Sequence, residues 1–261
     1  MSWRRIRGVA RRQWLTLRHS LPRIFDVFYW PIVEVLVWGL VTIYLLAQVG
    51  AAFTPAVFLG GMVLWIVLYR AQEDLAISVL EEAWSANTLN LFGSPLTALE
   101  YVVGSFGMSL IKTLLAAIAM SFLAWSIYGF GIWSLGPSLP GIAAALLLSG
   151  WALGLVVIGL ILRFGRRMDV LAWSFSHLIQ PLACAVYPVK ILPPSLQAVA
   201  GLLPPTHAFE AARAAIAGRP DYGEVSLAIS GAVLALGLSG WFAQRGLVRA
   251  REIGRLANPG E

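Results

Sequence analysis

Long apolar stretches dominate this chain, and short polar or basic stretches separate them. Apolar runs of roughly 20 residues are long enough for an α-helix to cross a bilayer core about 30 Å thick. The pattern predicts six such helices and therefore an all-α integral membrane protein with one transmembrane domain, 1–261. The approximate limits of the six spans are 24 or 29 to 48, 55 to 70 or a little beyond, 101 to 128, 141 to 162, 170 to 186 and 225 to 242.

Residues 1–23 alternate arginines with tryptophans and aliphatic residues. Trp3, Arg7, Ala10 and Trp14 recur at near-helical spacing. This pattern predicts an amphipathic helix that lies in the headgroup layer with its arginines towards anionic lipid. A disordered basic tail is the alternative, but the aromatic residues would have no use in a solvated tail.

The distribution of basic residues predicts the orientation. With the N-terminus inside, the basic N-terminal stretch, Arg70, the 163–167 loop and the arginine-rich C-terminal tail are all cytoplasmic, as the positive-inside rule requires. Only Lys190, Arg213 and Arg219 are then external. The protein is therefore expected to cross a bacterial inner or plasma membrane several times, with both termini in the cytoplasm.

The composition agrees with a membrane protein. The chain is 59% hydrophobic and 12% charged, with a mean hydropathy of +0.77, whereas soluble domains carry about twice that charge. The net charge of +6 does not indicate nucleic-acid binding, because the basic residues are dispersed at span ends. Cys184 is the single cysteine and is expected to be a small buried apolar residue.

One interior stretch, 81–100, reads EEAWSANTLNLFGSPLTALE and is polar enough to be cytoplasmic. Gly93 is placed to end a helix, and Ser94 with Pro95 resembles the N-cap and first position of the next one. The segment 80–93 is therefore predicted to be a short amphipathic helix that docks in a groove on a soluble partner. An ordinary interhelical loop is the alternative. The apolar stripe of the predicted helix consists of Leu80, Trp84, Leu89 and Phe92.

No catalytic, metal or cofactor motif is found. Neither lysine, Lys112 or Lys190, follows a glycine, as the lysine of an ATP-binding P-loop must. His19, His177 and His207 have no metal-ligand partner four residues on. If ATP drives this protein, another subunit must bind it.

Four residues within the spans are candidates for a substrate path. Glu34 and Lys112 are expected inside the hydrocarbon region, where a charge costs about 2.5–3.5 kcal/mol at a helix centre. They form either a polar site on the path or a structural pair, or Lys112 snorkels to the interface. Trp38 and Trp65 either line a channel or pack between helices.

A proline-rich segment, 188–222, precedes the last span and contains two short helical patterns. Glu210 and Arg213 are one turn apart, so a local ion pair is expected. A simple surface loop is the alternative reading of this segment.

Two motifs resemble those of type-2 ABC transporter permeases, and they occur in the same order and at a similar spacing. The resemblance covers nearly the whole chain. The first motif contains Glu81, Glu82, Asn87, Thr88, Leu89, Leu91, Ser94, Pro95 and Glu100. The second contains Tyr187-Pro188, Leu192-Pro193, Leu196-Gln197, Leu203 to His207, Glu210 and Arg213.

The resemblance implies the membrane subunit of an ATP-driven exporter. Two copies, or one copy with a similar permease, would enclose the path, and separate ATP-binding subunits would hold ATP and Mg. The external segment would form two re-entrant helices, with Tyr187, Pro188, Pro193, Pro204, Glu210 and Arg213 at an outer gate. The coupling helix, 80–93, would dock through Leu80, Glu81, Glu82, Trp84, Thr88, Leu89 and Phe92.

Two other classes remain as alternatives. An integral membrane enzyme acting on lipid usually clusters acids with histidines or metal ligands, whereas the acids between Glu73 and Glu82 have no histidine nearby. A secondary transporter is disfavoured by the scarcity of buried ionisable groups and of repeats. The chain lacks the Arg-Tyr and Gly-Trp pattern of polysaccharide exporters, which favours an amphiphilic small molecule or a lipid as substrate.

Overall fold

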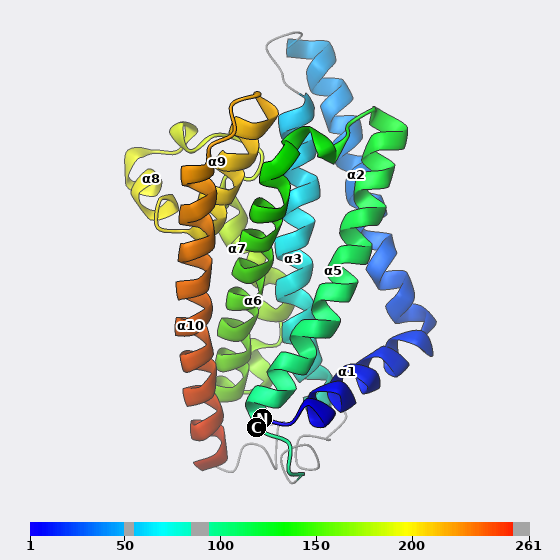
Figure 1. Cartoon of the computed structure of the whole chain (residues 1–261), viewed down its shortest axis with the longest axis vertical. Helices are drawn as coiled ribbons and strands as arrows, with labels where there is room; N and C mark the ends of the chain where they lie inside the picture. The colour runs from blue at the N-terminus through cyan, green and yellow to red at the C-terminus, as the bar shows by residue number, and fades with distance from the viewer. Residues whose placement is uncertain (50–54, 85–93, 253–261) are drawn as a thin grey trace.

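The computed structural model describes residues 1–49, 55–84 and 94–252, and all regular structure in these ranges is helical (Figure 1). The long helices run along the axis of an elongated bundle. They are α2 (Leu21–Val49), α3 (Pro55–Trp84), α5 (Ala98–Tyr128), α6 (Leu139–Phe164) and α10 (Tyr222–Glu252). The shorter elements are α1 (Trp3–Arg18), η2 (Ile132–Ser138), η3 (Arg166–Met168), α7 (Leu171–Ala183), η4 (Val189–Ile191), α8 (Pro194–Ala200) and α9 (Pro204–Ile216).

Five segments of the described chain are long and apolar enough to cross a membrane: 21–48, 55–82, 98–128, 132–164 and 222–252. The expected span at 170–186 is not among them. Its helix, α7, has 13 residues and ends at Cys184, whose φ of 55° is left-handed. A helix of 13 residues covers only about 20 Å. Of the six predicted spans, five are therefore helices of spanning length in the described chain, and the one at 170–186 is a short helix.

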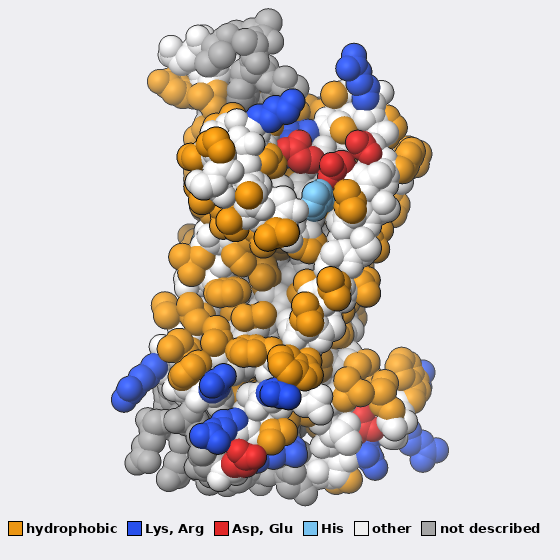
Figure 2. Space-filling model, turned by 90° about the vertical axis from the view of Figure 1, so that its left-hand side faces the viewer, with side chains coloured by type: hydrophobic (Ala, Val, Ile, Leu, Met, Phe, Trp, Pro, Cys, Tyr) orange, Lys and Arg blue, Asp and Glu red, His pale blue; other side chains and the backbone are white. Residues whose placement is uncertain are grey.

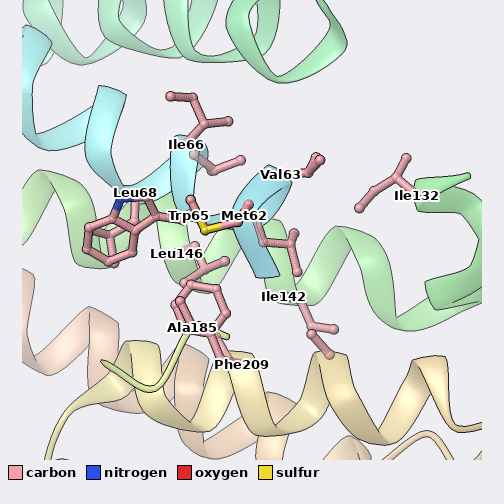
Figure 3. Packing of buried hydrophobic residues seen from close by; sticks show 14 of the residues in the cluster. Met62, Val63, Trp65, Ile66, Leu68, Ile132, Ile142, Leu146, Ala185 and Phe209 are labelled. Atoms are coloured by element: carbon pink, nitrogen blue, oxygen red, sulfur yellow. The ribbon is translucent and has the colours of Figure 1, made fainter. Parts of the chain in front are cut away.

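α3 is the central helix of the bundle. Its most apolar window is 78% buried, against 22% for those of α2, α5 and α10. Trp65, Ile66 and Leu68 of α3 belong to one buried cluster that also contains Ile142 of α6 and Phe209 of α9 (Figure 3). The same window of α3 is also the least hydrophobic of the five, with a mean hydropathy of 1.3. Charged residues such as its Arg70, Glu73 and Asp74 are costly against lipid, which explains its position among the other helices.

Glycines allow α6 to approach its two main neighbours closely. A Cβ on Gly150 would lie 2.4 Å from the carbonyl oxygen of Leu68 in α3. A Cβ on Gly246 of α10 would lie 2.8 Å from the carbonyl oxygen of Gly159. Small residues at helix contacts are a common means of close packing in membranes.

Two expected helix limits are wrong. The second span was expected to end near Arg70, but α3 continues without interruption to Trp84. Thr97, rather than Ser94, is the N-cap of α5. Its Oγ1 accepts a hydrogen bond from the N–H of Glu100 at 3.2 Å, and its own N–H donates to Glu100 Oε2 at 3.0 Å. This reciprocal capping box fixes the start of the helix at Ala98.

The predicted N-terminal amphipathic helix is present as α1, which crosses one end of the bundle (Figure 1). Ile6, Val9 and Leu17 are buried against the bundle, while Trp3 and Trp14 are exposed. On the face shown in Figure 2, charged side chains gather at the two ends of the molecule and hydrophobic side chains cover the middle. This distribution is the one that a bilayer requires.

Candidate functional site

A buried ionic network connects α2, α3 and α5. Arg70 of α3 is only 1% exposed and contacts three carboxylates. Its Nη1 lies 3.2 Å from Asp26 Oδ2 and 2.7 Å from Glu73 Oε2, and its Nη2 lies 3.3 Å from Asp74 Oδ1. Lys112 Nζ of α5 lies 3.3 Å from the same Asp74 oxygen. One buried cation therefore organises acids from two helices.

The network lies well inside the bundle. Arg70 precedes the end of α3 at Trp84 by 14 residues, which corresponds to about 21 Å of helix. The second span was expected to end near Arg70, whereas Arg70, Glu73 and Asp74 lie within one continuous helix. Pairing across helices compensates these charges away from water, although Arg70 Nε and Asp74 Oδ2 have no hydrogen-bond partner among the described residues.

Glu34 and Lys112 do not pair with each other. Lys112 binds Asp74 instead. Oε2 of Glu34 is buried and accepts no hydrogen bond within the described part of the chain. The two charges expected in the hydrocarbon region therefore have different roles, since one is structural and the other carries an unsatisfied oxygen.

A cavity of about 490 Å³ lies beside the network, between α2, α3 and α7. Its lining combines carboxylates with aromatic rings. Trp38, a candidate for the substrate path, lines it, whereas Trp65 is 1% exposed in the core and does not. The lining residues are Asp26, Trp30, Val33, Glu34, Val37, Trp38, Tyr69, Glu73, Trp173 and His177.

The predicted coupling segment begins as the last turn of α3. Leu80 is fully buried in a cluster with Val157 and Ala172, so its side chain is not accessible to a partner in this structure. Trp84 is 45% exposed. Its ring stacks on that of Trp173, with the ring centroids 5.9 Å apart and an interplanar angle of 15°. Its Nε1–H donates a hydrogen bond to Oδ2 of Asp169 at 3.2 Å. Thr88, Leu89 and Phe92 lie outside the described residues.

The acidic pair next to Trp84 binds the N-terminal region. Arg23 Nη1 of α2 lies 3.0 Å from Glu81 Oε2. Glu82 is 2% exposed and pairs with Arg12 of α1. The glutamate that ends the first motif, Glu100, accepts a hydrogen bond from the backbone N–H of Ser2 at 2.6 Å. These long-range contacts are invisible in the sequence, and they tie α1 to both helices that flank the coupling segment.

The predicted pair between Glu210 and Arg213 is present, with Oε1 of Glu210 2.9 Å from Nη2 of Arg213. The same carboxylate accepts the N–H of Val189 at 2.9 Å, and Arg213 Nη1 donates to the carbonyl of Cys184 at 2.6 Å. Burial alone would raise the pKa of Glu210, but the hydrogen bonds from Arg213 and Val189 outweigh it and lower the pKa below its ordinary value of 4.5.

The other residues assigned to the outer gate occupy the turns around this pair. Tyr187 donates from its hydroxyl to the carbonyl of Pro181 at 2.6 Å. Pro188 and Pro193 precede η4 and α8, and Pro204 is the first residue of α9. The segment 188–222 therefore holds two short α-helices, as its sequence predicts.

The five helices of spanning length define a multi-pass helical membrane protein. Residues 4–217 match the ABC-2 type transporter family, and the chain belongs to this family. The match includes α1 and every element as far as α9. No match to a curated protein is found.

Proposed function

We propose that this chain is the membrane subunit of an ATP-driven exporter, in which two copies, or one copy and a similar permease, enclose the substrate path. ATP and Mg bind to separate subunits at the cytoplasmic end. The chain itself performs no covalent chemistry. Membership of the ABC-2 type transporter family supports the transport function.

The observation that carries the proposal is the polar cavity between α2 and α7. Trp30 and Val37 at its edge are each 49% exposed, and the Asp26 side chain is 42% exposed. Ionised carboxylates at such depth are costly against lipid, so they normally face a bundle interior or water. A second permease on this side would cover the cavity and place it on a path between the two copies.

The contacts of Trp84 would connect the ATP-binding subunit to the substrate path. Its ring stacks on Trp173, and Trp173 lines the cavity. Trp84 is 45% exposed, and this exposed surface would contact a partner that docks at residues 80–93. ATP-driven displacement of this end of α3 would therefore reach the cavity wall through two stacked indoles.

The proposal includes six crossings with both termini cytoplasmic. α1 begins and α10 ends at the same end of the bundle, which supports an even number of crossings (Figure 1). In the proposal, the chain between α6 and α10 makes the return passage. α8 and α9 would be re-entrant helices that close the outer end. In a Cys184→Ser background, Ser94→Cys should react with an impermeant thiol reagent only from the cytoplasm, and Trp133→Cys only from outside. Reaction of both from one side would contradict this topology.

The alternative function, an integral membrane enzyme acting on lipid, gains no support from the family match. The two are separated by assaying the purified chain alone and after co-purification with a soluble ATP-binding subunit. The proposal predicts ATP hydrolysis only in the complex. Turnover of a lipid by the chain alone would favour the enzyme instead.

A further inference from the structure

We infer that the cavity between α2, α3 and α7 binds an organic cation with an apolar or aromatic body, and that such amphiphilic cations are the substrate class. This inference rests on the proposed transport function, because it takes the cavity as part of the substrate path. The charge of the site, its walls and its size each favour such a ligand.

The charge of the site is negative. Asp26, Glu34, Glu73 and Asp74 supply four carboxylates, whereas Arg70 and Lys112 supply two cations, which leaves a formal charge of −2 when all are ionised. Isolated buried charges are strongly disfavoured, so the excess must be neutralised by protons or by a bound cation. None of the residues that line the cavity is a lysine or arginine.

Glu34 is the group to which a ligand cation would bind. The other carboxylates of the network already contact Arg70. Oε2 of Glu34 is buried and accepts no hydrogen bond within the described residues, and Glu34 lines the cavity. Oδ2 of Asp74 also accepts none there, but Asp74 does not line the cavity. A buried acceptor left without a donor loses the hydration that it would have in water. A positively charged ligand group would satisfy it.

The walls favour an organic cation over a metal ion. Trp30, Trp38, Tyr69 and Trp173 present aromatic surface to the cavity. Aromatic faces attract cations and also provide apolar contact area, as in sites for quaternary ammonium ligands. Among the described residues, no three acidic, histidine or cysteine side chains are grouped to ligate a metal ion.

The volume fits a small organic molecule. The cavity measures about 490 Å³, and pockets for drug-sized ligands measure about 300–1,000 Å³. Exposure of Trp30 and Val37 at the edge leaves an entry from the side on which the second permease is proposed. A cation that combines a delocalised charge with aromatic rings would use every part of this lining.

Tetraphenylphosphonium and tetraphenylborate provide a matched test, since they have the same shape and opposite charge. Binding to the purified chain in zwitterionic detergent is followed by quenching of tryptophan fluorescence, with no ATP-binding subunit present. Saturable binding of the phosphonium, and no binding of the borate at the same concentrations, is expected. Equal binding of the two ions, or none of either, overturns the inference.

Variants locate the site. Glu34→Gln should weaken phosphonium binding by at least about tenfold, because truncating one partner of a buried charge pair has a large effect. Glu252→Gln, which changes an exposed carboxylate at the end of α10, should leave binding unchanged. Unaltered binding by monodisperse Glu34→Gln protein contradicts the assignment.

If Glu34→Gln does not fold, Trp30→Leu provides an independent test, because Trp30 is half exposed and removal of its ring does not introduce a polar group. It should weaken phosphonium binding several-fold; full retention of binding overturns the inference. The assay also separates the two proposals. Binding without ATP-dependent transport would contradict the exporter function alone, and ATP-dependent transport without phosphonium binding would contradict the cation site alone.

Discussion

Replacement of Arg70 by methionine tests whether the buried ionic network holds the bundle together. The substitution keeps a long apolar stem and removes the charge that contacts Asp26, Glu73 and Asp74. Asp74 retains Lys112 as a partner at 3.3 Å. Glu73, which is 2% exposed, keeps the hydroxyl of Tyr69 at 2.9 Å as its one hydrogen-bond donor among the residues that the structure describes. In this variant, Glu73 is therefore the carboxylate that is left buried without a positively charged partner.

The expected magnitude follows from this geometry. Removal of one partner from a buried ion pair destabilises a protein by about 3–5 kcal/mol. At about 2–4 °C per kcal/mol for a chain of this size, the melting temperature should fall by about 6–20 °C. Arg70→Met combined with Glu73→Gln should recover part of the loss, because the second change removes the orphaned charge.

The assay is thermal unfolding of detergent-purified protein, followed by tryptophan fluorescence and by the monodisperse fraction after heating. Arg249→Met is the matched control, because its pair with Glu252 is 65% and 58% exposed, and exposed pairs contribute about 0–1 kcal/mol. A shift for Arg70→Met no larger than that of the control would refute the reasoning. A double variant less stable than Arg70→Met would do the same.

Three further predictions concern other regions. Trp84→Ala should weaken docking of the ATP-binding subunit by more than about 2 kcal/mol, or roughly thirtyfold, as measured by co-purification. Trp133→Ala, at the opposite end of the bundle, is the control. Full retention of the partner by Trp84→Ala would remove Trp84 from the docking surface. The pKa of Glu210 is lowered in the fold, so its ionised form stabilises the protein above the ordinary pKa of 4.5, and this stabilisation is lost as the pH falls through the lowered pKa. The difference in melting temperature between wild type and Glu210→Gln should therefore shrink as the pH falls below 4.5. A difference that does not change with pH would contradict this. Gly150→Val should destabilise by about 1–3 kcal/mol through overpacking against α3, whereas Gly237→Ala, which faces open space, should be tolerated in the same unfolding assay.

The sequence predicts most of this fold because hydrophobic length is a local property. The helices α2, α5, α6 and α10 all occur where apolar runs of spanning length occur. α3 was given too short a span, since Arg70, Glu73 and Asp74 resemble a water-exposed connection. Their partners come from positions up to 44 residues away, and no local pattern reveals such pairing.

The candidate site was only partly predictable for the same reason. Glu34 and Trp38 stand out as polar or aromatic residues within a span, and both line the cavity. Asp26, Trp173 and His177 join them only through the packing of α2 and α7 against α3. At the other end, the helical stripe that contains Leu80 and Trp84 gives no sign that Leu80 is buried under Ala172 while Trp84 remains accessible.

Side-dependent labelling of the cavity tests most directly whether ATP drives the opening of this path. Val37 lines the cavity and is 49% exposed, so Val37→Cys in a Cys184→Ser background provides a reporter without altering a charge. The protein is reconstituted with its ATP-binding subunit, and an impermeant thiol reagent is added to one side at a time. The account predicts labelling from the cytoplasmic side without ATP and from the external side when ATP is bound. Labelling rates from both sides that do not change with ATP would contradict it.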